Sequence, residues 1–356
     1  MKLPKISIIL IVYDMQRQAM VTLRSLCPDY QQGISADDYE VIVVENRSAR
    51  CLDPAAVAAL PGPFTYTLRD EPGKSPAAAI NFALSQARGQ TIGIMIDGAR
   101  MLSPGVLRHV SMACAITPDA LVAVPGYQLG SSPHDLTSDH SQADEIALLD
   151  QIGWPGIGES GIGNFAIGYR LFEIASMSLA NRAGFFLPFM ESNCLFAPAE
   201  VLRELGGADE RFDLPGGGAL NLYMYYRLAY HPRTTLFLLP GEGSFHQIHG
   251  GVTTSSREDR DAFLGSILAQ LNAILGMPFR SPDMAPILLG VLPPDLHPFL
   301  SFSAEKYAKS MQRKKRGVEE RIAAGADPDA HPGPYTARTR ASKIVEVPVG
   351  TLVQKR

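Results

Sequence analysis

The sequence predicts an α/β protein with a mostly parallel central sheet, flanking helices and a C-terminal helical extension. Through the first 125 residues, apolar runs of strand length alternate with segments in which apolar residues recur at helical spacing. The runs are nearly continuous, as in strands that are buried on both faces of a parallel sheet. This alternation implies parallel strands joined by right-handed helical crossovers.

The expected strands of this sheet cover residues 6–12, 39–45, 64–70, 91–96 and 120–125. The first follows a basic start, as in a signal peptide. We nevertheless interpret it as a strand, because it is short, rich in β-branched residues and lacks a small-residue cleavage site. Before the last of these strands, Ser103-Pro104 is typical of a helix start, with serine as the N-cap and proline at the first helical position.

The strand and helix patterns of apolar residues are weaker after residue 126. We expect order to return at 185–198, with helices at 199–205, 221–231 and 258–276 and a strand at 234–240. The glycines between residues 127 and 192 do not follow a strand or open a helix, as a dinucleotide-binding fingerprint requires. A flap or acceptor loop is the better interpretation of this segment.

Composition narrows the class of protein. The chain has 356 residues, 46% of them hydrophobic and 19% charged, which is ordinary for a protein with a full core. A net charge of −4 argues against a nucleic-acid-binding protein. The four cysteines show no metal-ligand or redox spacing, which is typical of a reduced, cytoplasmic protein. No stretch approaches the roughly 20 apolar residues that a membrane-spanning helix needs.

A basic helical stretch follows a proline-rich segment near the C-terminus. It contains four consecutive charged residues, Arg313 to Arg316. A solvated helix face is the interpretation that we favour for this run. The alternative is peripheral contact with anionic lipid headgroups at a membrane.

Acidic residues follow several of the expected strands. Asp14, Glu45, Asp70 and Asp97 each stand at or just after the end of an apolar run. The carboxyl ends of parallel strands are where open α/β sheets bind ligands, so the repetition favours a polar ligand site there. For Asp97-Gly98 alone, a simple turn is the competing interpretation.

Four segments, in this order, resemble the family-2 glycosyltransferases, which have the GT-A fold. They are SIILIVYD (7–14), EVIVVENRS (40–48), GKSPAAAINFALSQARGQTIGIMIDGA (73–99) and LGGADERF (205–212). The late segment GEGSFHQIHGG (241–251) indicates a divergent subset of this family. The resemblance implies a nucleotide-sugar-binding half at 1–126, an acceptor-binding half at 127–251, and a helical extension with a loosely ordered tail at 252–356.

The resemblance also implies an activity and a donor site. It implies transfer of a sugar from a nucleotide-diphosphate donor to an acceptor hydroxyl, usually with inversion. Polysaccharides, glycolipids or glycosylated small molecules would be the products, made from saccharide, lipid-linked or small-molecule acceptors. On the matching motif positions, the donor-binding residues are Tyr13, Asp14, Glu45, Lys74, Asn81 and Asp97.

Two departures from the family pattern concern the chemistry. The DXD triplet reads Asp97-Gly98-Ala99, so its second acid is missing. The Glu-Asp pair that should follow LGGADERF is also missing, and no acid follows Asp213 in that segment. A catalytically degenerate nucleotide- or sugar-binding relative is therefore the first alternative. A nucleotidyltransferase is the second, although no glycine-rich loop follows the first strand.

The late histidines offer a partial replacement for the missing acid. A divalent cation, Mn²⁺ or Mg²⁺, would neutralise the diphosphate leaving group, and a histidine ligand favours Mn²⁺. We expect Asp97 and His246 to hold this ion, preferring His246 to His249 because it comes directly off a strand. A hydrogen-bonded structural histidine is the competing interpretation for either ring.

The general base must be a carboxylate near the acceptor. Glu191 is our first candidate, because it follows an apolar run and a partly buried carboxylate usually has a function. A pair with Arg182 or a helix cap is the structural alternative. Asp213 is the second candidate, since it is nearest to the position of the lost Glu-Asp pair.

Overall fold

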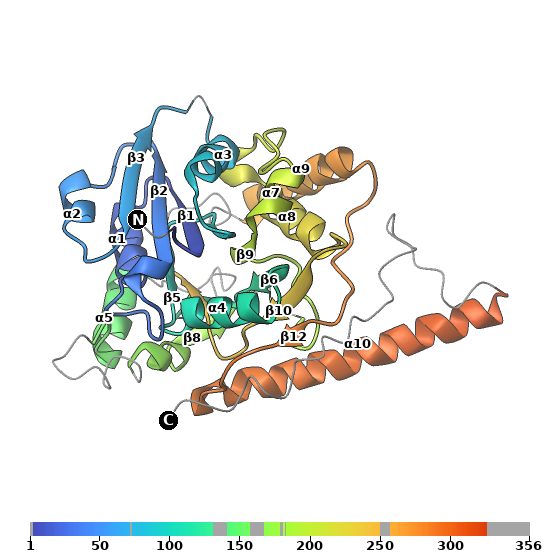
Figure 1. Cartoon of the computed structure of the whole chain (residues 1–356). Coiled ribbons are helices and arrows are strands. Elements are labelled where there is room, and N and C mark those ends of the chain that lie inside the picture. Colours follow the sequence, from blue (N-terminus) through green and yellow to red (C-terminus); the bar gives the residue numbers. More distant parts are fainter. Residues whose placement is uncertain are drawn as a thin grey trace.

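The computed structural model describes residues 3–71, 73–130, 141–156, 167–178, 181, 183–249 and 257–325 (Figure 1). Its centre is an eight-stranded mixed sheet. In spatial order the strands are β12 (Ile287–Leu288), β10 (Thr235–Leu238), β6 (Ala120–Ala123), β9 (Cys194–Pro198), β4 (Thr91–Met95), β1 (Ile6–Val12), β2 (Tyr39–Asn46) and β3 (Phe64–Arg69). All neighbouring pairs are parallel except those that β9 makes with β4 and β6.

Helices cover both faces of this sheet. The helices in the described residues are α1 (Gln16–Arg24), α2 (Pro54–Ala58), α3 (Ala77–Gln86), α4 (Val106–Ile116), α5 (Gln142–Ile152), α7 (Ala199–Glu204), α8 (Leu220–Ala229), α9 (Arg257–Leu275) and α10 (His297–Ala323). Alternate residues of each strand enter different cores, because successive side chains point to opposite faces. In β1, Ile9 and Ile11 pack with α3, α7 and α8, whereas Ile8 and Leu10 pack with α1 and α4. The α/β fold class predicted from the sequence is confirmed.

A second, four-stranded sheet lies beside the first. Its order is β5 (Arg100–Leu102), β11 (Ser244–His246), β7 (Gly126–Leu129) and β8 (Ala175–Met177). One face of it is aromatic: Tyr127 stacks on Phe245 at 5.2 Å between ring centroids and meets Phe299 of α10 at 5.1 Å. The start of α10 is therefore anchored on the back of the small sheet.

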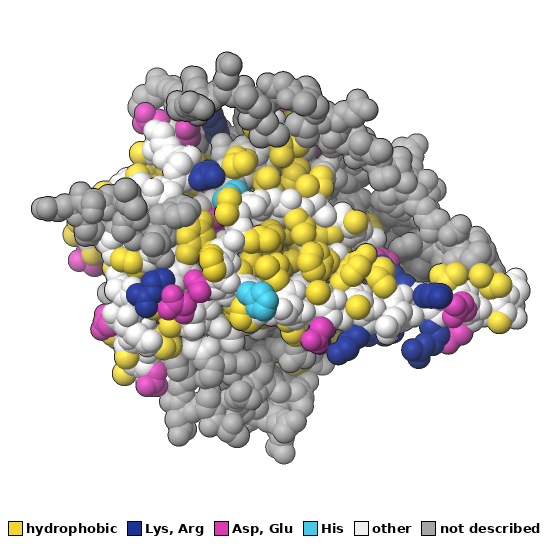
Figure 2. Space-filling model, turned by 90° about the horizontal axis from the view of Figure 1, so that it is seen from below, with side chains coloured by type: hydrophobic (Ala, Val, Ile, Leu, Met, Phe, Trp, Pro, Cys, Tyr) yellow, Lys and Arg dark blue, Asp and Glu magenta, His cyan; other side chains and the backbone are white. Residues whose placement is uncertain are grey.

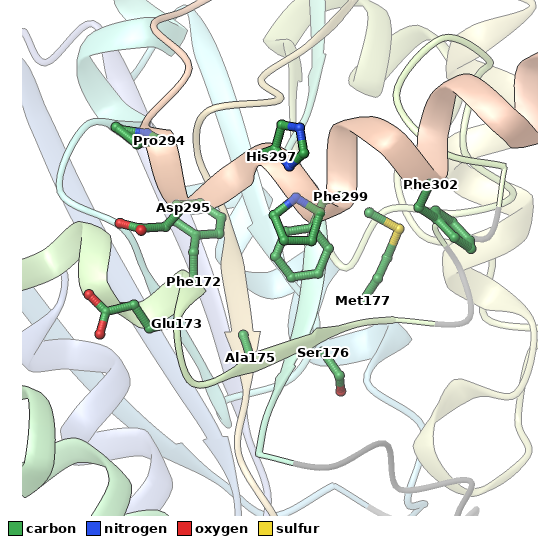
Figure 3. A pocket seen from close by; sticks show the side chains of 11 residues that line it. Phe172, Glu173, Ala175, Ser176, Met177, Pro294, Asp295, His297, Phe299 and Phe302 are labelled. Carbon is green, nitrogen blue, oxygen red and sulfur yellow. The ribbon is translucent and has the colours of Figure 1, made fainter.

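A pocket of about 740 Å³ opens where β8 meets the start of α10 (Figure 3). Phe172, Met177, Phe299 and Phe302 line it with apolar surface. In Figure 3 Ser176 points away from the pocket, as expected for a strand residue beside Met177.

The expected helix start at Ser103-Pro104 is wrong. Residues 100–102 form strand β5, and α4 begins at Val106 with Gly105 as its N-cap residue. The Ser103 hydroxyl donates instead to the buried carboxylate of Glu242, at 2.5 Å. The Ser103 hydroxyl therefore binds a residue that is distant in the sequence instead of capping a helix, as the local pattern predicted.

The predicted helical extension is present as α9 and α10, and α10 runs along one side of the molecule and past its body (Figure 1). No helix in the described residues is long and apolar enough to cross a membrane. Both predicted halves contribute strands to the large sheet, and the boundaries at residues 126 and 251 stay a prediction. We expected a flap or acceptor loop at 127–192, and the described part of this segment contains most of β7 as well as α5 and β8. Its residues 131–140 and 157–166, Arg182 and the tail beyond residue 325 lie outside the described residues.

Candidate active site

Strands β1, β2 and β4 end at the same edge of the large sheet. Val12 is in register with Glu45 and Leu10 with Met95, so the residues after these strands meet at one edge. The sequence placed Asp14, Glu45 and Asp97 there, and the parallel pairing confirms that their strands end together. This is the edge where open α/β sheets bind ligands.

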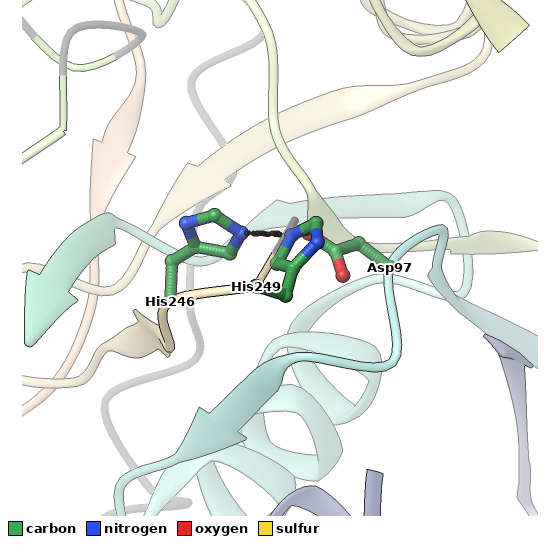
Figure 4. Close-up of side chains that lie close together, drawn as sticks. All are labelled: Asp97, His246 and His249. Atoms are coloured by element: carbon green, nitrogen blue, oxygen red, sulfur yellow. Dashed lines mark hydrogen bonds and ion pairs between the residues drawn. The ribbon is translucent and has the colours of Figure 1, made fainter. Parts of the chain in front are cut away.

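Asp97 lies at the centre of a cluster at this edge (Figure 4). Its Oδ1 accepts a hydrogen bond from the Ala99 N–H at 2.9 Å, which fixes the carboxylate at the turn after β4. Its Oδ2 lies 3.0 Å from Nε2 of His246 and 3.7 Å from Nε2 of His249. The expected pair of Asp97 and His246 is therefore in contact, and His249 joins it.

The second sheet brings the histidines to Asp97. Strand β11 pairs antiparallel with β5, and this register sets His246 opposite Arg100, three residues after Asp97. On its other side His246 faces Gln128 of β7, and its Nδ1 donates to the Gln128 side-chain oxygen at 2.8 Å. Because Nδ1 carries the proton, Nε2 of the neutral ring presents a lone pair towards Asp97 and His249.

The three side chains have the arrangement of a metal site. One ligand atom of each lies within 4.8 Å of the other two, and the two Nε2 atoms are 2.9 Å apart. Metal–ligand bonds of about 2.1 Å set neighbouring ligand atoms about 3 Å apart, close to the separations found here. The bond from His246 to Gln128 is the outer contact that metal-binding histidines typically make. The residues present therefore fit a divalent cation.

Local charges act differently on the three groups. Burial opposes ionisation of Asp97, but the two histidines outweigh it and hold the pKa of this carboxyl well below its usual range. Burial and the nearby charge of Arg100 lower the pKa of His246 to about 4. Burial also works against the charged form of His249, yet the Asp97 carboxylate raises the pKa of this ring overall. Near neutral pH, His246 is thus an unprotonated ligand beside an ionised carboxylate.

Arg100 adds a positive charge to this cluster. Its side chain is 8% exposed, and its Nε lies 3.5 Å from Oδ2 of Asp97. Nε and one terminal nitrogen have no hydrogen-bond partner among the described residues. The guanidinium therefore has spare donors beside the place where a charged ligand would bind.

Helices α1 and α5 clamp the segment that carries the histidines. Gln18 of α1 donates to the Ile248 carbonyl at 2.7 Å, and Gln247 donates back to the Gln18 carbonyl at 3.0 Å. The buried Glu145 of α5 accepts the Ile248 N–H and pairs with Arg17 at 2.9 Å. These contacts hold the backbone on both sides of Gln247, so they set the positions of His246 and His249.

Glu45 is fully buried and has one unused oxygen. Its Oε2 accepts from the Leu52 N–H at 2.9 Å and from the Tyr66 hydroxyl at 2.7 Å. Its Oε1 has no partner among the described residues, and burial raises the pKa of the carboxyl. A buried acceptor without a partner is costly, so a ligand donor or a water would be accommodated here.

The other expected donor-binding residues have varied surroundings. Tyr13 is exposed, and Asp14 pairs with Arg50, whose hydrogen bonds lower the pKa of Asp14. Lys74 is exposed, and its carbonyl accepts from the Gly216 N–H. The Asn81 amide group bonds both backbone groups of Ala208, at 2.8 and 2.9 Å. Asn81 therefore holds the loop after α7, and its role towards a donor stays a prediction.

The two candidates for the general base differ in their burial. Glu191 is partly buried, accepts from the Asn221 amide at 3.2 Å and lies near Arg100. Burial raises the pKa of Glu191, while Arg100 and the neighbouring amides reduce the shift. Asp213 is exposed and accepts from Gln270 at 2.8 Å. The charge of Arg100 acts on both Glu191 and His246, so Glu191 is the candidate that shares a charged neighbour with this cluster.

The sequence analysis missed several residues of the cluster around Asp97. His249 was weighed and set aside, although its spacing of three from His246 was the available signal. Arg100 directly follows the modified triplet and was overlooked there. Gln128 and Glu145 had no local signal, because only the strand register and the packing of α5 bring them to the cluster.

Comparisons with known proteins give similarities of structure alone. No family model and no curated protein sequence matches the chain. Residues 1–349 of TarS from S. aureus, in complex with UDP, match with 12% identity over 75% of this chain and 65% of that one, with a TM-score of 0.44. The mannosyltransferase PcManGT from Pyrobaculum calidifontis, in complex with GDP-Man and Mn²⁺, matches with 19% identity over 92% and 77%, with a TM-score of 0.45. The chain thus spans less than two thirds of the TarS fragment, and 40% of the longer TarS chain.

Proposed function

We propose that this protein is a glycosyltransferase that moves a sugar from a nucleotide-diphosphate donor to an acceptor hydroxyl, with inversion and with a divalent cation. The observation that carries the proposal is the convergence of Asp97, His246 and His249 at the carboxyl edge of the parallel strands. Glu45 lies at the end of β2, at the same edge, and offers a buried acceptor without a partner. The motif order of the sequence supports the same function.

His249 takes the place of the missing second acid of the DXD triplet in this proposal. When bound, a cation would neutralise negative charge that develops on the diphosphate leaving group. A donor set of one carboxylate and two imidazoles favours Mn²⁺ over Mg²⁺, which prefers oxygen ligands. Arg100, with its unused donors, supplies further positive charge next to Asp97.

The nucleoside and the diphosphate need their own partners. Glu45 Oε1 would accept a hydrogen bond from a base N–H or a ribose hydroxyl. The exposed Lys74 would reach a phosphate as a point charge. Tyr13 is the exposed aromatic residue that directly follows β1, at the same edge.

Glu191 is the proposed general base. The base must take a proton from the acceptor hydroxyl, and a carboxyl with a raised pKa holds that proton better than an ordinary one. Asn221 holds the carboxylate in place at 3.2 Å. Asp213 is the second candidate, but it is exposed and accepts a hydrogen bond from Gln270.

Calorimetric titration with UDP, GDP and dTDP, each with and without Mn²⁺, tests the donor site. We expect one nucleotide to bind tightly and only with the metal. Binding of one nucleotide without transfer to any acceptor would favour a degenerate relative, which the missing Glu-Asp pair also suggests. Failure of all three nucleotides to bind would refute the proposed function.

A further inference from the structure

Helix α10 is a basic element on an acidic protein. It carries seven lysines and arginines and three glutamates, a net charge of +4. The whole chain has a net charge of −4, so the remainder carries −8. A charge separation of this size favours an anionic partner at α10.

Several basic side chains of α10 face solvent. Lys309, Arg313, Lys315 and Arg316 are exposed. Lys309 and Lys315 make only long contacts with glutamates of the same helix, at 3.9 and 4.0 Å. Arg313 and Arg316 have no carboxylate partner within the described part of the chain. The charge of these four side chains is therefore available to another molecule, whereas Lys314 pairs with Asp283.

Exposed aliphatic side chains precede α10 in the sequence. Ile287, Leu288, Val291 and Leu292 are 38%, 40%, 68% and 48% exposed, and we call them the aliphatic strip. The strip begins in β12, which is an edge strand of the large sheet. Both β12 and α10 lie at the bottom of Figure 1, and Figure 2 views the molecule from that side. There, hydrophobic side chains gather in the centre, and Lys and Arg lie along the helix together with a smaller number of acidic side chains.

We propose that the aliphatic strip and the basic side chains of α10 form a docking surface for a membrane with anionic headgroups. The aliphatic side chains would enter the membrane interface. Each basic side chain would attract the anionic headgroups and raise the affinity for the membrane about fivefold. The anchor is peripheral, since no described helix can cross a membrane. This surface lies outside the proposed donor site and does not depend on its function.

A second copy of this chain suits the surface less well. Pairing of two copies through the same strip would follow a two-fold axis and bring two α10 helices of net charge +4 towards each other. The resulting repulsion opposes such a dimer, whereas an anionic membrane gains from the same charge. Glu173 and Asp295 line the pocket beside the start of α10 and lie outside the basic run at 313–316.

Co-sedimentation of the full chain with lipid vesicles tests the proposal. We expect binding to phosphatidylcholine vesicles that contain phosphatidylglycerol, and little binding to phosphatidylcholine alone. Raising the salt from about 0.1 M to about 0.5 M should weaken the binding. The variant Arg313→Glu/Arg316→Glu should bind at least about 25-fold more weakly. The variant Val291→Ser/Leu292→Ser should also bind several-fold more weakly, because the apolar contribution is lost.

A matched control is Lys5→Glu/Arg47→Glu, which changes the net charge equally at β1 and β2, on the far side of the sheet from β12. It should keep nearly all of the binding. An equal loss in this control would overturn the proposal, because net charge alone would then explain the binding. So would failure of the native chain to bind anionic vesicles, or a dimer in analytical ultracentrifugation that Val291→Ser/Leu292→Ser converts to a monomer. Circular dichroism checks that each variant is folded.

Discussion

The Nε2 atoms of His246 and His249 lie 2.9 Å apart, and both approach Oδ2 of Asp97. Two ring nitrogens and a carboxylate oxygen all carry lone pairs, so such an approach needs protons or a cation between them. Gln128 already accepts the Nδ1 proton of His246, which leaves its Nε2 free for a metal. In the proposed function, this geometry would let the site hold a cation without the second acid of DXD.

Replacement of His249 by alanine should remove a metal ligand. We expect Mn²⁺ affinity to fall by more than about 100-fold, since loss of an outer contact alone costs about 10- to 100-fold. Electron paramagnetic resonance of free Mn²⁺ measures this without an activity assay. His231→Ala, which removes a pair with Glu204 and a hydrogen bond from the Arg233 N–H, is the control. Unchanged affinity would show that His249 is a structural residue.

Asp97→Asn should abolish the Mn²⁺ dependence of nucleotide binding. The amide keeps the shape of the side chain but loses the negative charge that binds the cation. Calorimetry with and without Mn²⁺ compares the variant with the native chain. If the metal still strengthened nucleotide binding in this variant, Asp97 would not be a ligand.

Gln128→Leu should weaken metal binding without touching a ligand. The hydrogen bond from Nδ1 fixes the ring and proton position of His246, so its loss should lower Mn²⁺ affinity about 10- to 100-fold. Gln128→Glu retains an acceptor and should restore most of the affinity. A rescue of this kind separates a positioning role from a general loss of stability.

Glu191→Gln should keep donor affinity and lose about 100- to 10,000-fold in turnover. The base acts in its ionised form, and burial raises its pKa, so the activity of the native enzyme should fall as the pH drops through a value above that of ordinary glutamate. Arg100 favours the ionised form of Glu191. In Arg100→Met the activity should therefore begin to fall at a still higher pH than in the native enzyme. Retained turnover in Glu191→Gln would redirect attention to Asp213.

Much of the fold was predictable because its signals are local. The strands around Ile9, Ile42 and Ile94 are apolar runs, and their parallel order followed from the helices between them. Strand β9 could not be placed, because its antiparallel position between β4 and β6 depends on a connection of about 70 residues from β6. The prediction of a helix start at Ser103 was wrong for a related reason, since Glu242, which accepts the hydrogen bond of its hydroxyl, lies 139 residues away.

The site was predictable only in part. The resemblance to the family-2 glycosyltransferases, together with the position of Asp97 after a strand and the late histidine segment, led us to pair Asp97 with His246. The sequence led us to prefer His246 to His249, whereas the structure brings both rings to Asp97. The register of β11 with β5, which no sequence pattern encodes, places this segment there. Gln128 and Glu145 reach the cluster from β7 and α5, so their roles depend on tertiary packing.

Incubation of the protein with a panel of nucleotide-diphospho-sugars, followed by detection of the released nucleotide, tests the central claim most directly. We predict slow release of the nucleoside diphosphate from one donor, with Mn²⁺ and without added acceptor, and its loss in Asp97→Asn. Release of a nucleoside monophosphate instead would show cleavage within the diphosphate and contradict glycosyl transfer. No release from any donor, with or without candidate acceptors, would contradict a catalytic role for this site.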